Sequence, residues 1–223
     1  MADDLAYTVR RSPRARRVRV RVDPHAGVEV VLPPRAAGRE AAAAVAELRP
    51  WIERRLAEAA AARARLASPP GTVPYLGAVL EIRPERGRTR VHRRGEELVV
   101  PAGETAGPAI ERWYRSRARA EIAPRLDLAS VALGRPYTGL SIRSQRTRWG
   151  SCSSQGAMSF NWRLLLAPEP VLDYVVWHEA CHLVVMDHSR RFWGLLERHL
   201  PSYREPPRWL RANGSALVLP EAG

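Results

Sequence analysis

An almost continuous apolar run near the C-terminal end constrains the fold of this chain more than any other feature. Residues 171–185 have the sequence VLDYVVWHEACHLVV, which predicts a buried helix with His178, Glu179 and His182 in its middle. Burying a carboxylate and two imidazoles costs several kcal/mol unless these groups are paired or bind a metal ion. The run contains no arginine that could pair with the glutamate locally. It therefore predicts a core helix whose polar residues are paired with other groups or bind a metal ion.

The spacing of these polar residues is typical of a zinc site. Positions 178 and 182 are four residues apart, so their side chains lie on one helical face, roughly 6 Å apart. In the pattern H-E-x-x-H two imidazoles bind zinc and the glutamate acts as the general base. His188 is the predicted third ligand, provided that the helix ends near Met186 and Asp187 and a turn brings the ring back. The alternative is that these histidines are ordinary core residues satisfied by hydrogen bonds.

Composition limits the class of protein. The 223 residues carry a net charge of +13 and contain no lysine, so all 36 cationic side chains are arginines. This charge favours either a surface generally coated with arginine or a face that binds polyanions. Two cysteines exclude a disulfide scaffold as a class. Neither a signal peptide nor a membrane-spanning run is recognisable, which predicts a cytoplasmic protein without membrane contact.

The first half of the chain mixes strands with one long helix. Residues 17–22, RVRVRV, alternate between arginine and valine, and with the following VEVVLPP they predict a hairpin. Residues 39–66 are rich in Ala, Glu, Arg and Leu and predict a helix, which Pro50 divides or restarts. Short strands are expected between residues 72 and 101. This half is therefore predicted to be β-rich.

The second half is predicted to be mainly helical. A break at residues 102–108 precedes a helix from about Ala109, which we expect to bend or stop near Pro124. LSIRS and AMSFNWRLLL (residues 157–166) read as strands. Helices fill the remainder, with Ser189 a plausible N-cap after the apolar run.

The residues around the motif also resemble a known family. The stretch RWGSCSSQGAMSFNWRLLLAPEPVLDYVVWHEACHLVVMDHSRRFW resembles the YgjP-like metal-dependent hydrolases, which are related to SprT-like and other zincin-type metallopeptidases. The resemblance is dense from about Gln145 to Trp209 and looser through YTVRRSPRARRVRVRV and GTVPYLG. It implies an α+β chain, with a zincin-like metallopeptidase domain (a small β-sheet with the active-site helix) at 102–223, after a β-rich N-terminal region with a long helix at 1–101. It also implies one Zn²⁺ per chain, Glu179 as the catalytic acid/base, and three metal ligands, His178, His182 and His188.

The predicted function is a zinc-dependent hydrolase. We expect a metallopeptidase that uses a zinc-bound water, with Glu179 as general base and a peptide or protein as substrate. One alternative is a metal-dependent nucleotide pyrophosphohydrolase, because an arginine-rich cleft would suit phosphates. Another is a nucleic-acid-associated module with an auxiliary metal site. It is suggested by RRSPRARRVRVRV and by the helical arginines Arg112, Arg115, Arg117 and Arg119.

Substrate binding is assigned to the strand before the helix. If MSFNWRLLL forms a sheet edge beside the cleft, an extended peptide can add to it through backbone hydrogen bonds. Alternation then directs Asn161 and Arg163 to one face, and both are predicted substrate-binding residues. The developing oxyanion needs an electrophile beyond the metal, for which the candidates are these two residues, His199 and Tyr203.

Overall fold

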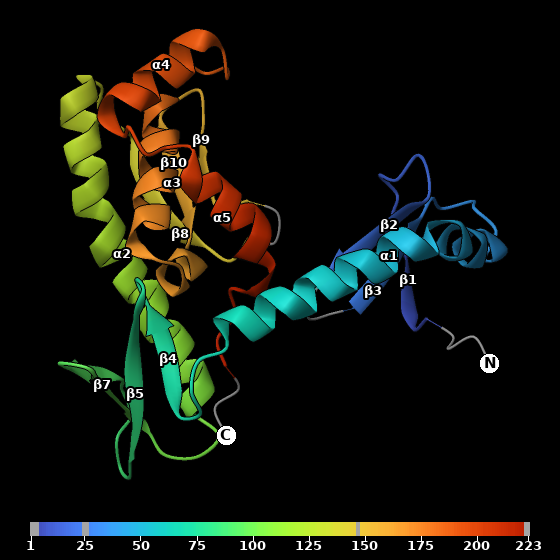
Figure 1. Ribbon diagram of the computed structural model, residues 1–223, viewed down its shortest axis with the longest axis horizontal. Coiled ribbons are helices and arrows are strands. Elements are labelled where there is room, and N and C mark those ends of the chain that lie inside the picture. The colour runs from blue at the N-terminus through green and yellow to red at the C-terminus, as the bar shows by residue number, and fades with distance from the viewer. Residues whose placement is uncertain (1–4, 24–26, 146–147, 221–223) are drawn as a thin grey trace. The chain divides into compact units, whose positions relative to one another are not determined.

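The computed structural model in Figure 1 describes residues 5–23, 27–145 and 148–220. The chain divides into two compact units: the first comprises Met1–Ala67 with Ala212–Ala216, and the second Ser68–Arg211 with Leu217–Gly223. Both units combine helices and strands, which confirms the predicted α+β class and the β-rich N-terminal region. The catalytic domain at residues 102–223 stays a prediction.

The first unit is a three-stranded sheet covered by one helix. Its strands follow the order β1-β3-β2, with β1 parallel and β2 antiparallel to β3. The alternating valines of residues 17–22 are partly buried against the core, as their period of two predicts. The bounds are Tyr7–Arg11 for β1, Arg19–Asp23 for β2, Gly27–Leu32 for β3 and Arg39–Leu66 for α1.

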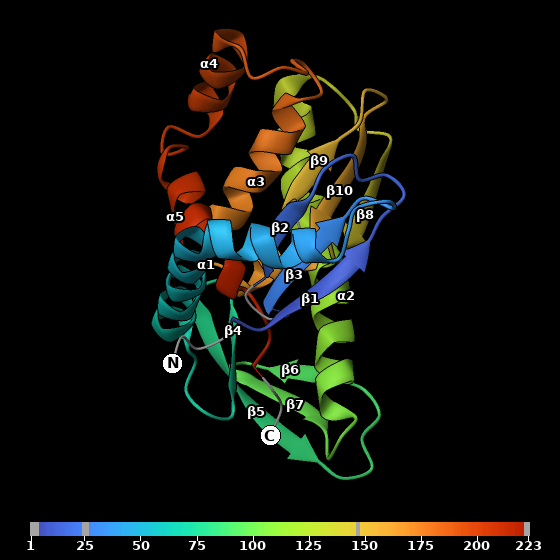
Figure 2. The same cartoon turned by 90° about the vertical axis from the view of Figure 1, so that its right-hand side faces the viewer.

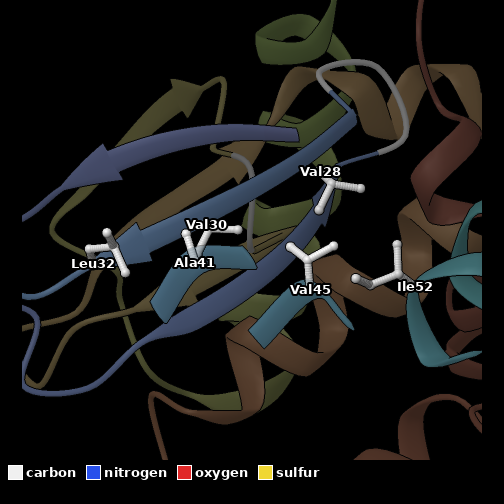
Figure 3. Close-up of a cluster of buried hydrophobic side chains, with 6 residues drawn as sticks. All are labelled: Val28, Val30, Leu32, Ala41, Val45 and Ile52. Carbon is white, nitrogen blue, oxygen red and sulfur yellow. The ribbon is translucent and has the colours of Figure 1, made fainter. Parts of the chain in front are cut away.

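The core of this unit lies between β3 and α1 (Figure 3). The β3 residues alternate along the strand and the α1 residues recur at helical spacing, so each set lies on one face. The buried side chains are Val28, Val30 and Leu32 from β3 and Ala41, Val45 and Ile52 from α1. Pro50 lies inside α1 without ending it, so residues 39–66 form one helix rather than two pieces.

The second unit begins with a four-stranded sheet of order β4-β5-β7-β6. Here β5 and β7 are parallel and the two outer strands are antiparallel to their neighbours. The bounds are Thr72–Tyr75 for β4, Ala78–Glu85 for β5, His92–Arg94 for β6 and Glu97–Pro101 for β7.

The helix α2 (Ala106–Leu133) connects this sheet to the rest of the unit, because it contacts both β7 and β8 (Figure 1). It begins three residues before the predicted start at Ala109. It also continues through Pro124, so the expected stop there is wrong. Gly134 ends the helix in a left-handed conformation with φ of 61°, which glycine adopts without steric cost.

A three-stranded sheet of order β8-β10-β9 lies next along the chain. The predicted strand over residues 157–166 is too long, since β10 ends at Asn161. The Asn161 side chain accepts a hydrogen bond from the Arg163 backbone N–H and so caps a 3₁₀ helix. β10 is also the central strand, so the expectation that it forms a sheet edge is wrong. The bounds are Gly139–Arg143 for β8, Gly150–Cys152 for β9, Ala157–Asn161 for β10 and Trp162–Leu166 for η1.

Helices complete the chain. Most of the apolar run lies in α3, which begins at Glu169 and ends at Cys181, earlier than expected. Arg125 of α2 donates hydrogen bonds to Asp173 at 2.9 Å and to Glu169, so it holds the first turns of α3. Of the helices that the structure describes, none is long and apolar enough to span a membrane. The bounds are Glu169–Cys181 for α3, Arg190–His199 for α4, Glu205–Asn213 for α5 and Gly214–Ala216 for η2.

Candidate metal centre

Three histidines meet at the end of α3. His178 lies in the last turn of the helix, His182 is its C-cap, and His188 follows in the connection to α4. One ring nitrogen from each lies within 4.8 Å of the others. The Nε2 atoms of His178 and His188 are 3.0 Å apart. The structure therefore brings together the three residues that the sequence predicted as ligands.

The early end of α3 explains how His188 reaches the cluster. The backbone N–H groups of Val184 and Val185 both donate to the carbonyl of Cys181, which tightens the last turn. Asp187 then accepts a hydrogen bond from the backbone N–H of Ser189 at 2.9 Å, just before α4 begins. These local bonds shape the connection between the two helices, in which the ring of His188 contacts His178 of α3 and Phe192 of α4.

Hydrogen bonds on the outer side of the rings fix their orientation. Nδ1–H of His182 donates to the carbonyl of Val185 at 3.0 Å, which leaves Nε2 as the free nitrogen of that ring. The hydroxyl of Tyr174 lies 3.3 Å from Nδ1 of His178. Metal-binding histidines commonly use their second nitrogen in this way, because the bond sets the tautomer and the direction of the first.

Aromatic side chains from α4 pack against the cluster. The ring centroid of the buried Phe192 lies 5.0, 4.6 and 4.8 Å from those of His178, His182 and His188. Trp193 contacts the rings of His178 and His188 from the same helix. Because these rings are rigid and packed, they restrict the rotamers that the imidazoles can adopt.

Glu179 lies beside the cluster and is only 8% exposed. The backbone N–H of Cys152 in β9 donates a hydrogen bond to its carboxylate. Gly150 of the same strand is in close contact, since a Cβ added there would lie 2.5 Å from Cγ and 2.8 Å from Oε1 of Glu179. The strand therefore binds the carboxylate through the Cys152 N–H, and the absence of a side chain at Gly150 provides the space for the Glu179 side chain.

Burial sets the charge state of the site. It raises the pKa of the Glu179 carboxyl to about 7, although the Cys152 N–H and the charge of Arg148 act in the opposite direction. Burial also lowers the pKa of His178 to about 4, with smaller contributions from the neighbouring His182 and His188. The pKa of His182 is lowered as well, first by burial. The imidazoles of His178 and His182 are therefore neutral near pH 7, the form that binds a metal ion.

A cleft of about 340 Å³ opens beside His178 and Glu179. One side is the edge strand β9 with the residues before it, and the other is formed by α3 and α5. Most of its side chains are apolar, and Arg148 is the cation among them. The remaining lining residues are Trp149, Gly150, Tyr174, Val175, Pro207 and Leu210.

The other predicted site residues lie outside the lining of this cleft. Asn161 is 2% exposed, and its amide donates to the carbonyl of Gln145 at 2.7 Å. Arg163 donates to Ser144 Oγ at 2.9 Å and lies over a tryptophan ring. His199 stacks on Trp177, and Tyr203 stacks on Trp193. The substrate-binding roles of Asn161 and Arg163 and the oxyanion roles of all four stay predictions.

Sequence reasoning missed several residues of the site. Tyr174 precedes His178 by four positions, so helical periodicity alone could have placed it beside that ring. Gly150 lies in the strand β9. Its contact with Glu179, the Cys152 hydrogen bond and the packing of Phe192 join segments distant in sequence, and no local pattern indicates them.

The cluster has the chemistry of a divalent-metal site. Three imidazoles suit zinc, and tetrahedral ligands at 2.0–2.1 Å from zinc are about 3.4 Å from one another. The Nε2 atoms of His178 and His188 are already 3.0 Å apart, and Nδ1 of His178 and Nδ1 of His182 each have another hydrogen-bond partner. The residues present therefore fit such an ion.

Comparison with known proteins identifies the family. Residues 16–213 match the family model described as YgjP-like, metallopeptidase domain. No curated protein gives a significant match. Among solved structures, the crystal structure of the metallopeptidase zymogen abylysin of Pyrococcus abyssi is 24% identical with a TM-score of 0.37, over 40% of this chain and 92% of that one. Because the family model spans most of the sequence, the chain belongs to the YgjP-like metallopeptidase family and is a metal-dependent hydrolase.

Proposed function

We propose that this chain is a zinc peptidase in which one Zn²⁺ is held by three histidines, His178, His182 and His188. The observation that supports this most is the meeting of three imidazole nitrogens within 4.8 Å beside the buried Glu179. When bound, the ion supplies Lewis acidity that activates water and polarises the scissile carbonyl.

Glu179 is the general base of the proposed reaction. Its carboxylate accepts a proton from the attacking water and passes it to the nitrogen of the leaving amine, so the same group acts first as base and then as acid. The Cys152 N–H orients the carboxylate toward the cleft. Burial raises the pKa of this carboxyl to about 7, which increases its affinity for that proton.

The edge strand β9 is the proposed platform for the substrate. β10 pairs with both of its neighbours, whereas one side of β9 is the edge of the sheet next to Glu179. An extended peptide can pair with this edge through its backbone. The apolar wall formed by Val175, Pro207 and Leu210 would then receive an apolar side chain.

The proposal is tested by metal content and by hydrolysis. We expect purified protein to contain or take up zinc, and to cleave casein or members of a peptide library. Glu179→Gln should abolish cleavage while zinc stays bound, because glutamine cannot accept the proton but is close in size. Glu197→Gln is the matched control, since this exposed carboxylate lies on α4 outside the cleft.

Three results would contradict the proposal: no zinc uptake, cleavage that survives Glu179→Gln, or no hydrolysis of any peptide. The same wild type and variant are assayed with nucleoside triphosphates. If only nucleoside triphosphates are hydrolysed, and Glu179→Gln abolishes that hydrolysis, the result would favour a nucleotide pyrophosphohydrolase over a peptidase.

A further inference from the structure

A basic segment lies far along the chain from the metal centre and has no part in the proposed peptidase. Residues 86–95, RGRTRVHRRG, contain five arginines and no acidic residue. Arg88 forms an ion pair with Glu85 at 3.0 Å. The exposed Arg86 and Arg90 add to a positive surface at this end of the second unit.

A cavity of about 450 Å³ opens in this region between β6 and α2. Figure 2 shows β6 beside the first half of α2. No acidic residue is among the described residues that line the cavity. They are Val91, His92, Arg93, Gly95, Trp113 and Arg117. Of the four helical arginines noted in the sequence, Arg117 is the one that lines it.

The charged walls of this cavity are held in place before any ligand arrives. The guanidinium of Arg93 lies 4.9 Å from the ring centroid of Tyr75, and its Nε donates to the carbonyl of Gly95 at 2.8 Å. Arg117 donates to Glu121 at 2.9 Å. Because a guanidinium has five N–H donors, each of these side chains has further donors for a ligand. Little conformational entropy is lost when such fixed groups bind.

The indole of Trp113 supplies a flat apolar wall beside these cations. Its own orientation is fixed by Tyr75, at 5.5 Å between ring centroids, and by Tyr114, at 5.0 Å and nearly perpendicular. Arginine binds phosphate bidentately, and an aromatic ring stacks with a base of any sequence. The cavity thus combines recognition of a phosphate with recognition of a planar ring.

We propose that this cavity binds a nucleotide unit of a single-stranded nucleic acid. A strand suits the surface better than a mononucleotide, because Arg86 and Arg90 extend the positive charge beyond the cavity toward further phosphates. A single strand suits it better than a duplex, because only an unpaired base presents its face to the indole. The proposal is independent of the metal centre and of the peptidase reaction.

The experiment measures binding of a labelled oligothymidylate of about 12 nucleotides by fluorescence anisotropy over a range of salt concentrations. Arg93→Gln should weaken binding about tenfold or more, the loss expected for one charge-assisted contact. It should also reduce the slope of log affinity against log salt by about one. Arg94→Gln is the matched control, since it removes the same charge at the next residue. The two side chains alternate across β6, where Arg93 lies opposite Leu98 and Arg94 opposite Glu97.

We expect Arg94→Gln to weaken binding much less than Arg93→Gln, and Arg93→Gln to leave peptide hydrolysis unchanged. Equal losses in the two variants would overturn the proposal, since they would indicate a general effect of charge. So would an absence of binding at low salt, binding of thymidine monophosphate as tight as that of the oligonucleotide, or tighter binding of a duplex. Circular dichroism of each variant confirms that its fold is intact.

Discussion

Gly150→Ala should disable the site without touching a metal ligand. The added Cβ would lie 2.5 Å from Cγ, 2.8 Å from Oε1 and 2.9 Å from Cδ of Glu179. Carbon atoms in contact are about 3.5–4.0 Å apart, so the side chain or the strand must move by about 1 Å. Neither has an easy direction, because Glu179 is buried and the Cys152 N–H in the same strand is bonded to its carboxylate.

The magnitude follows from this displacement. Overpacking of a buried contact costs about 1–3 kcal/mol of stability. A displacement of about 1 Å at a catalytic group costs on the order of 10²-fold in rate. We therefore expect kcat/KM for a peptide substrate to fall about a hundredfold, while zinc affinity changes little because the three atoms nearest to the added Cβ all belong to Glu179 and none to an imidazole.

Gly139→Ala is the control for this variant. Gly139 lies in β8 of the same sheet, and a Cβ added there meets nothing within 4 Å. The two variants are compared by peptide hydrolysis, zinc titration and urea unfolding. If Gly150→Ala keeps the activity of Gly139→Ala, the reasoning about the contact is refuted. If it loses zinc together with activity, the damage is general rather than confined to Glu179.

Three further predictions concern metal binding and pH. Tyr174→Phe should lower zinc affinity about 10–100-fold in a calorimetric titration, because the ring of His178 loses its outer partner; unchanged affinity would contradict that role. Chelation should lower the midpoint of thermal unfolding, since zinc at a thousand times its Kd contributes about 4 kcal/mol, and His182→Ala should remove the response. In the metal-free protein the pKa of Glu179 is raised to about 7 from 4.5, so the folded state binds the extra proton and stability falls by up to about 3 kcal/mol as pH rises through this range. In urea unfolding measured across this pH range, the free energy of unfolding of Glu179→Gln should fall less than that of the wild type. Identical pH profiles for the two proteins would contradict this contribution of Glu179.

Local periodicity explains what the sequence could predict. The four-residue spacing of His178 and His182 places two rings together on any helix, and the apolar run requires that helix to be buried. The alternation of residues 17–22 and the alanine-rich composition of 39–66 similarly determine a strand and a helix from neighbours alone. In each case the sequence pattern and the element that it predicts occupy the same short stretch of the chain.

Two predictions of where an element ends were wrong because the effect of a side chain on the backbone depends on its tertiary contacts. Pro124 was expected to bend or stop a helix, but α2 does not stop there: it continues along two sheets and α3, whose packing outweighs one missing backbone donor. Residues 162–166 were read as a continuation of the strand, whereas the Asn161 side chain caps a 3₁₀ helix there and accepts a hydrogen bond from the Arg163 N–H. That cap ends β10. Because β10 pairs with β8 on one side and with β9 on the other, β9 rather than β10 is an edge strand.

The position of Glu179 depends on elements that the motif does not contain. The start of α3 is held by Arg125 of α2, and its end packs against Phe192 of α4. The direction of the Glu179 side chain is then determined by β9, which donates one N–H and offers a glycine where any other residue would collide. An H-E-x-x-H helix alone could place two imidazoles, but it could not keep a carboxylate buried and aimed at the same cleft. In the proposed mechanism, the arrangement of these packed elements, rather than the motif alone, is what suits that glutamate to act as a general base.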